Sequence, residues 1–267
     1  MDILFHPKAK VFDLAQDAGY LLAIQAILQG KFEELLAAFG VCCSSWILTS
    51  RGSSHRSELT PMGNPEFAKV KLANLLGSRT VLLLLLVAAV SGVWVVEQPS
   101  TSMLFSHDRF RWLVDSLEKL KMRVFSQTFW MRSWGHPTAK RTVAFSNSAL
   151  IGGLNAGSLK RQQLQSDVKT TRKYTTKEGR KGFSGTIFDV AWKYAAKIVQ
   201  IGEDAKFEKR DPVPAVEDLT KDTIDAYAQL EWGDSWDDAQ LVSVIKYARA
   251  SKLLWLPECW RQVLPKR

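Results

Sequence analysis

Hydrophobic positions along the chain follow helical spacing in some stretches and form short apolar runs in others. At 64–66 the sequence Asn-Pro-Glu supplies a capping amide, a proline suited to a first turn and a carboxylate, and it predicts the start of a helix that runs to about Val90. Gly92 is expected to stop that helix. The apolar, β-branched run 93–96 predicts a strand buried on both faces.

The same order of elements recurs on either side of this unit. Before this unit, a strand is expected at 11–14, a helix at 15–29 and a short apolar run at 39–42. After it, a helix is expected at 108–120 and strands at 122–129 and 142–145. Alternating strands and helices predict an α/β fold with a mostly parallel, Rossmann-like sheet and helices on both faces. Ligands bind beyond the carboxyl ends of strands in such sheets, where the loops 41–46 and 95–99 fall.

The pattern weakens after residue 150. Amphipathic stripes resume at 187–198 and at 241–248. We therefore expect three parts: an α/β domain over 1–150, a basic linker over 151–185 and a helical C-terminal appendage over 186–267.

Composition and charge favour a folded protein with a polyanionic partner. Of 267 residues, 46% are hydrophobic, which is enough for a full core, and the net charge is +9. The run 157–182 carries eight basic residues against two acidic ones (8 − 2 = +6), whereas 211–238 carries one against nine (1 − 9 = −8). The basic run is either a solvated linker or a segment that tracks phosphates. The residues expected to contact nucleic acid are Arg51, Arg56, Arg172, Lys173, Arg180 and Lys181.

The cysteine and histidine content predicts neither a disulfide framework nor a metal site. Two of the three cysteines are adjacent, so they cannot close a tetrahedral zinc site, and the histidines lack metal-ligand spacing. Because 1–10 has no apolar signal region, we expect a reducing, intracellular location, nuclear or cytoplasmic. The apolar stretch 81–96 is short of the roughly 20 residues of a membrane span. It is expected to be buried in a soluble protein, with membrane anchoring as the alternative.

Several short segments, taken in order, resemble the conserved loops of the DNA cytosine-5 methyltransferases and their phage-type relatives. Those families place a Pro-Cys pair after one strand and a Glu-Asn pair after the next. The segments that carry the resemblance are 12–14, 40–45, 63–64, Asn74, Arg79, 94–99 and 134–147.

The resemblance implies a chemistry for particular residues. Cys43 would be the nucleophile that adds to a cytosine turned out of its stack, and Glu97 would be the carboxyl group that bonds the ring nitrogen. Cys42 stands in place of the proline and is expected to point into the fold, while Cys43 faces Glu97. Gln98 stands in place of the asparagine. The methyl donor would be S-adenosylmethionine, held by Asp13, Asp17 and Gly19.

Three functions remain open from the sequence. The first is methyl transfer to cytosine through Cys43. The second is an inactive methyltransferase-like module that binds nucleic acid or acts as a scaffold through 157–182. The third is a membrane-associated protein anchored by 81–96. The two cysteines can also be explained by packing alone, without a catalytic role. Glu97 can likewise be explained as the charged residue that ends an apolar strand.

Overall fold

The computed structural model describes residues 13–28, 35–164, 168, 171–175, 179, 181–185 and 192–207. Some expectations therefore lie outside the described residues. These include the first half of the strand expected at 11–14, Arg180, residues 187–191 of the stripe expected at 187–198, the acidic stretch 211–238 and the helical stripe at 241–248.

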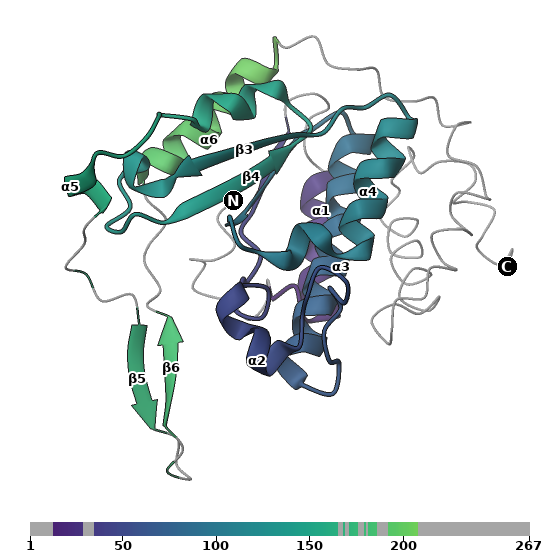
Figure 1. Ribbon diagram of the computed structural model, residues 1–267. Helices are drawn as coiled ribbons and strands as arrows, with labels where there is room; N and C mark the ends of the chain where they lie inside the picture. Colours follow the sequence, from purple (N-terminus) through teal and green to yellow (C-terminus); the bar gives the residue numbers. More distant parts are fainter. Residues whose placement is uncertain are drawn as a thin grey trace, which may run out of the picture.

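The described strands form a four-stranded mixed sheet and a separate two-stranded one (Figure 1). The larger sheet has the order β1-β2-β4-β3, and its strands are β1 (Leu36–Phe39), β2 (Val93–Pro99), β4 (Arg141–Ser146) and β3 (Phe125–Trp130). β1 runs parallel to β2, whereas β2–β4 and β3–β4 are antiparallel. The α/β character is confirmed.

The expectation of a mostly parallel sheet does not hold for the described strands. A parallel neighbour needs a crossover of a dozen or more residues, usually with a helix. Between β3 and β4 the chain has only the short 3-10 turn η4 (Met131–Trp134), so it returns as an antiparallel strand.

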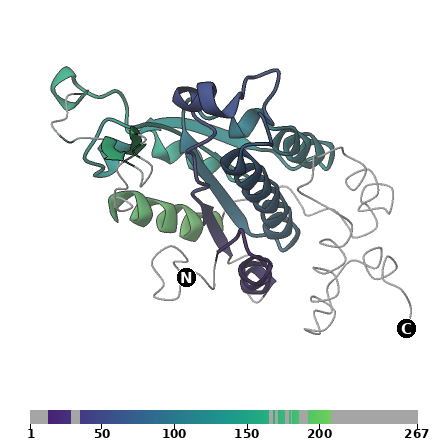
Figure 2. The ribbon, with the colours of Figure 1, turned by 90° about the horizontal axis from the view of Figure 1, so that it is seen from below.

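Helices cover both faces of the sheet, as Figure 2 shows from below. On one face lie α1 (Asp17–Leu28), α3 (Ala68–Ala89) and α4 (Asp108–Lys119), and on the other lies α6 (Trp192–Ala205) with η5 (Ala149–Leu154). Trp94 and Val96 of β2 belong to the core under the first group, and Val95 belongs to the core under α6. The prediction of a strand buried on both faces is confirmed.

The structure describes parts of the expected linker and of the expected appendage. α6, expected in a separate appendage, packs Tyr194, Ile198 and Ile201 against the sheet, because that face presents apolar side chains that need cover. The expected linker 151–185 contains regular structure. It holds part of η5, the short helix α5 (Arg161–Leu164) and an antiparallel hairpin of β5 (Thr171–Thr175) and β6 (Lys181–Gly185).

The apolar stretch 81–96 is divided between two elements. α3 ends at Ala89 and β2 begins at Val93, and Ser91 rather than Gly92 takes the left-handed conformation, with φ of 56°. α3 is long and apolar enough to cross a membrane by length and composition alone, and 61% of its most apolar window is buried inside the protein. That degree of burial fits a core helix.

The remaining short elements, η2 (Leu48–Ser50), α2 (Arg51–Ser54) and η3 (Met103–Ser106), lie in the loops that follow β1 and β2. A buried arginine ties the first of these loops to α3. The Arg56 guanidinium is 2% exposed and lies 3.5 Å from the centre of the Trp46 ring. Its nitrogens donate to Ser45 O (3.1 Å), Ser45 Oγ (3.2 Å), Pro61 O (2.5 Å), Val70 O (3.4 Å) and Asn74 Oδ1 (2.8 Å).

This arrangement corrects the expectation that Arg56 contacts phosphate, because its donors are directed at the protein. None of the described partners of the guanidinium is a carboxylate. Burial accordingly lowers the pKa of Arg56 to about 10. Gly63, with φ of 64°, lets the backbone pass close, since a Cβ there would lie 2.8 Å from Arg56 Cγ.

Replacing Arg56 should destabilise the whole domain. In Arg56→Ala the buried oxygens lose their donors, and we expect the free energy of unfolding to fall by about 3 kcal/mol in urea titrations. Arg56→Lys should recover little of the lost stability, because a single ammonium group cannot donate to all the acceptors that surround the planar guanidinium. Arg51→Ala, at an exposed position in α2, is the matched control and should change stability by less than about 0.5 kcal/mol. Equal losses in Arg56→Ala and Arg51→Ala would contradict this role.

A buried histidine starts α4. His107 Nδ1 accepts a hydrogen bond from Arg109 N at 3.2 Å, and the ring packs edge-on against Trp46 at 5.4 Å. Burial, together with the positive charges of Arg109 and Arg56, lowers the pKa of His107 from 6.5 to about 3.

This shift makes stability depend on pH. Between about pH 3 and 6.5 the unfolded chain binds a proton at His107 that the folded chain does not, so the free energy of unfolding should fall as the pH falls through this window. The contribution of one group is at most about 1.4 kcal/mol per pH unit. His107→Asn keeps a capping acceptor but does not titrate. Urea titrations from pH 7 to pH 4 should therefore show a shallower loss for this variant; parallel pH profiles would contradict the assignment.

Candidate functional site

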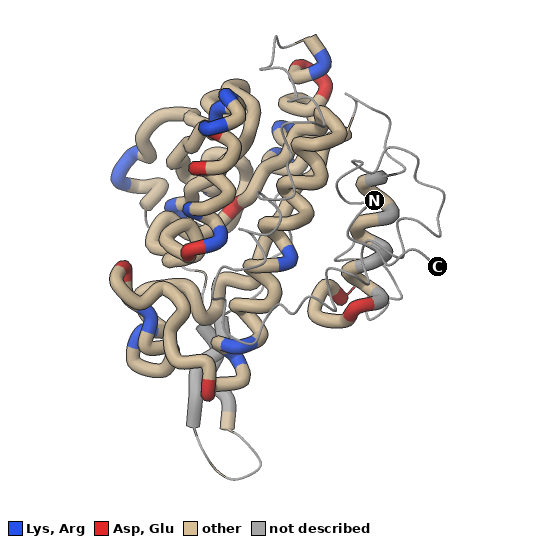
Figure 3. Tube along the Cα trace, turned by 90° about the vertical axis from the view of Figure 1, so that its right-hand side faces the viewer, with Lys and Arg blue, Asp and Glu red and all other residues tan. Residues whose placement is uncertain are grey.

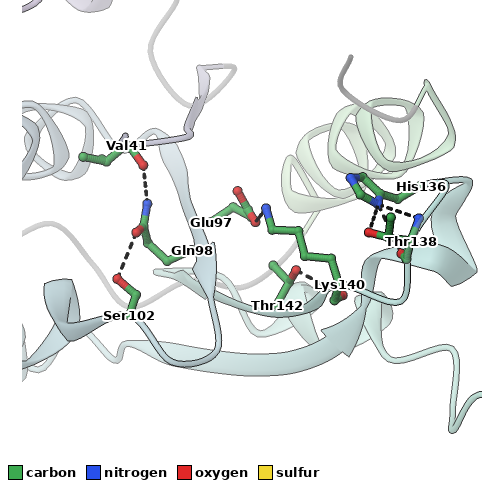
Figure 4. A network of polar contacts seen from close by, with 8 residues as sticks. All are labelled: Val41, Glu97, Gln98, Ser102, His136, Thr138, Lys140 and Thr142. Atoms are coloured by element: carbon green, nitrogen blue, oxygen red, sulfur yellow. Dashed lines mark hydrogen bonds and ion pairs between the residues drawn. The ribbon is translucent and has the colours of Figure 1, made fainter. Parts of the chain in front are cut away.

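The loops that follow β1 and β2 adjoin at one edge of the sheet because these two strands are parallel neighbours. Gln98 joins them. Its Nε2 donates to Val41 O at 2.5 Å, and its Oε1 accepts a hydrogen bond from Ser102 Oγ at 2.9 Å (Figure 4). Gln98 is 1% exposed, so this link is an internal one. The prediction that the cysteine loop faces the glutamate loop is confirmed.

Glu97 and Lys140 form the polar centre of this edge. Lys140 Nζ lies 2.8 Å from Glu97 Oε1, with side-chain exposures of 33% for Lys140 and 17% for Glu97 (Figure 4). Lys140 reaches Glu97 because it precedes β4, which pairs with β2. In this ion pair the Glu97 carboxylate accepts a hydrogen bond from Lys140, whereas the resemblance implied that Glu97 bonds the ring nitrogen of a cytosine.

The two adjacent thiols lie differently from what the sequence suggested. Cys42 is exposed, and its Sγ is 3.4 Å from Ser44 Oγ, so the expectation that it points into the fold is wrong. Without the ring of a proline, this position is free to turn outward. Cys43 is half-buried, and burial raises the pKa of its thiol; Lys140 lowers that pKa, while Cys42 and Glu97 raise it.

Two further residues lie at this edge. His136 Nδ1 accepts a hydrogen bond from Thr138 N at 3.1 Å. The pKa of His136 is lowered, mainly by burial and also by the charge of Lys140, while the Thr138 backbone and the charge of Glu97 act in the opposite direction. On α6, burial and the Glu97 charge raise the pKa of Tyr194. We call Cys43, Glu97, His136, Lys140 and Tyr194 the strand-end site.

Sequence reasoning missed three members of this site. His136 and Lys140 fall within 134–147, which carried part of the resemblance, but no role pointed to them. Tyr194 lies on an amphipathic stripe and gave no signal beyond packing. Its approach to Glu97 depends on α6 covering the sheet.

The residues expected to hold S-adenosylmethionine are instead bonded to the chain itself. Asp13 Oδ1 accepts a hydrogen bond from Ala15 N at 2.9 Å, and Asp17 forms an ion pair with Arg79. A Cβ on Gly19 would lie 2.2 Å from Asp13 O, so the space beside this glycine is filled by backbone. These contacts fix the start of α1, and the Asp17 side chain remains 78% exposed.

The expected nucleic-acid contacts are dispersed. Arg51 is exposed on α2, whereas Arg56 is buried. Arg172 and Lys173 lie on β5, and Lys181 on β6 pairs with Thr175 of β5. Among the residues that the structure describes, there is no group of three or more His, Cys, Asp or Glu that could hold a metal ion.

Comparisons with models of protein families, with curated proteins and with solved structures found no match for this chain.

With Cys42 turned into the fold and Cys43 facing Glu97, the resemblance implied that Cys43 would react first, and the structure predicts the reverse order. With limiting iodoacetamide at neutral pH, we expect Cys42 to be labelled before Cys43, because Cys42 is exposed and burial raises the pKa of Cys43. Lys140→Met removes the charge that lowers this pKa and should slow Cys43 labelling several-fold, leaving Cys42 unchanged. Peptide mapping by mass spectrometry measures both. Faster labelling of Cys43 in the parent chain would contradict this geometry.

Proposed function

We propose that this chain is a methyltransferase-like domain, related to the DNA cytosine-5 type, that binds nucleic acid and holds a base at the strand-end site without transferring a methyl group. The observation that carries the proposal is that the loop of Cys43 follows β1 beside the end of β2, which holds Glu97, and that Gln98 bonds Val41 O across the two. In α/β sheets this is where ligands bind.

The chemistry of the strand-end site suits a planar, polar ring. Glu97 Oε1 is bonded to Lys140, and Oε2 has no hydrogen-bond partner among the described residues, so it can accept from an N–H group of a base. Lys140 Nζ has further protons to donate to a ring nitrogen or carbonyl. Cytosine offers an amino group beside a ring nitrogen, which matches this neighbouring acceptor and donor.

Two observations favour binding over methyl transfer. Backbone fills the space beside Gly19, where a glycine-rich cofactor turn would need room, and Asp13 and Asp17 make contacts that fix the start of α1. Burial also raises the pKa of Cys43, which leaves less of the thiolate that would attack a base. The positive net charge fits a nucleic-acid partner.

Glu97→Gln separates base contact from general charge attraction. The change removes a negative charge, so attraction to phosphate alone would tighten binding. If Glu97 accepts from a base, affinity for a fluorescein-labelled single-stranded oligodeoxycytidine should fall by about tenfold, the equivalent of about 1.4 kcal/mol. Fluorescence anisotropy measures this loss.

Glu118→Gln is the matched control, because it makes the same charge change at an exposed position on α4. It should leave affinity unchanged or slightly higher. Unchanged or tighter binding by Glu97→Gln would overturn the base contact. S-adenosylmethionine should leave the parent affinity unchanged, and a saturable effect of that cofactor would restore methyl transfer as the function.

A further inference from the structure

The loop that follows β1 holds two thiols that are adjacent in the chain but lie at different depths. Cys42 is exposed, and Cys43 is half-buried. Residues 35–50 carry no charged side chain, and Figure 3 marks the charged positions along the trace. No carboxylate of this segment therefore repels an anionic reagent that approaches the loop, and the exposed sulfur of Cys42 is the one that such a reagent meets first.

Hydrogen bonds hold the backbone on either side of the peptide that joins the two cysteines. Before it, Val41 O accepts from Gln98 Nε2 at 2.5 Å. After it, Cys43 O accepts from Trp46 N at 2.9 Å. The pair is thus set between two fixed points, so a change in the conformation of this peptide must displace at least one of them.

A disulfide between adjacent residues strains the backbone. Consecutive Cα atoms are about 3.8 Å apart, whereas ordinary disulfides join Cα atoms that are roughly 4.4–6.8 Å apart. Closing Cys42 onto Cys43 must therefore twist the peptide between them and turn the exposed sulfur inward. Strained or exposed disulfides are easily reduced again, which is the behaviour of a regulatory pair and not of a structural one.

The twist acts on the strand-end site through the link between the two loops. β1 and β2 are parallel, with Phe39 opposite Val96, so the loop of the thiols and the end of β2 leave the sheet side by side. Gln98 follows Glu97 in β2, is 1% exposed and holds the thiol loop by its bond to Val41. Weakening that bond moves the thiol loop relative to Glu97 and changes the space beside its carboxylate.

We propose that Cys42 and Cys43 form a modification site for low-molecular-weight disulfides, and that closing the pair lowers the affinity of the strand-end site for a base, an effect that rests on the proposed function. First, the Cys42 thiolate attacks one sulfur of the reagent, forms a mixed disulfide and releases one thiol. The Cys43 thiolate then attacks Cys42 Sγ, closes the disulfide and releases the second thiol. The pair loses two electrons and two protons, and the reagent gains both as it becomes two thiols.

Oxidised glutathione is the probe for this exchange. The reduced chain is treated with it, the disulfide is located by peptide mapping, and affinity for labelled single-stranded oligodeoxycytidine is measured by fluorescence anisotropy. We expect a bond between Cys42 and Cys43 and an affinity about tenfold lower, which corresponds to the loss of roughly one hydrogen bond to the base. Reduced glutathione should reverse both changes.

Two variants separate this pair from other thiols. Cys42→Ser removes the attacking thiol, lies outside the strand-end site and keeps an oxygen beside Ser44, so oxidised glutathione should leave its affinity at that of the reduced parent. Cys259→Ser removes the third cysteine of the chain, which lies outside the described residues. This variant should respond to the reagent as the parent does.

Each outcome decides the proposal. A mixed disulfide that persists at Cys42 without closing, an unchanged affinity after closure, an equal loss in Cys42→Ser, or a response that disappears in Cys259→Ser would overturn the regulation and leave base binding intact. Failure of the reduced parent to bind the oligonucleotide would overturn the proposed function and, with it, the regulation of the strand-end site.

Discussion

The central strand β2 is the constraint on which the other elements depend. It pairs with β1 along one edge and with β4 along the other, so its backbone is satisfied on both sides. Its side chains enter separate cores on the two faces. Because neither edge nor face of β2 is exposed, the neighbouring strands and the helices on both sides pack against it. The register of β2 in the sheet fixes the positions of Glu97 and Gln98.

Two buried polar side chains then shape the loops at the ends of the strands. Arg56 supplies donors to carbonyls from separate segments, and Gln98 supplies one to Val41 and accepts from Ser102. Loops that leave a sheet have carbonyls without ladder partners, and burying them unpaired is costly. Satisfying those carbonyls also holds the loop of Cys43 against the loop of Glu97.

Lys140 changes what the strand-end site can do. A thiol and a carboxyl group alone would match the chemistry of a nucleophile and an acid. With an ammonium on the carboxylate, the pair becomes an acceptor beside a donor, which suits recognition of a polar ring.

The sequence by itself determined the elements whose signal is local. The start signal at 64–66 marked α3, which begins at Ala68, and helical spacing marked α4. The run 93–96 marked a doubly buried strand followed by a polar loop, so the approach of the Cys43 and Glu97 loops could be predicted. Only the tertiary structure decided the direction of β3 and β4, the burial of Arg56, the outward turn of Cys42 and the inclusion of α6. These depend on contacts between residues far apart in the chain, as when Lys140 reaches Glu97, and spacing along a sequence carries no record of such contacts.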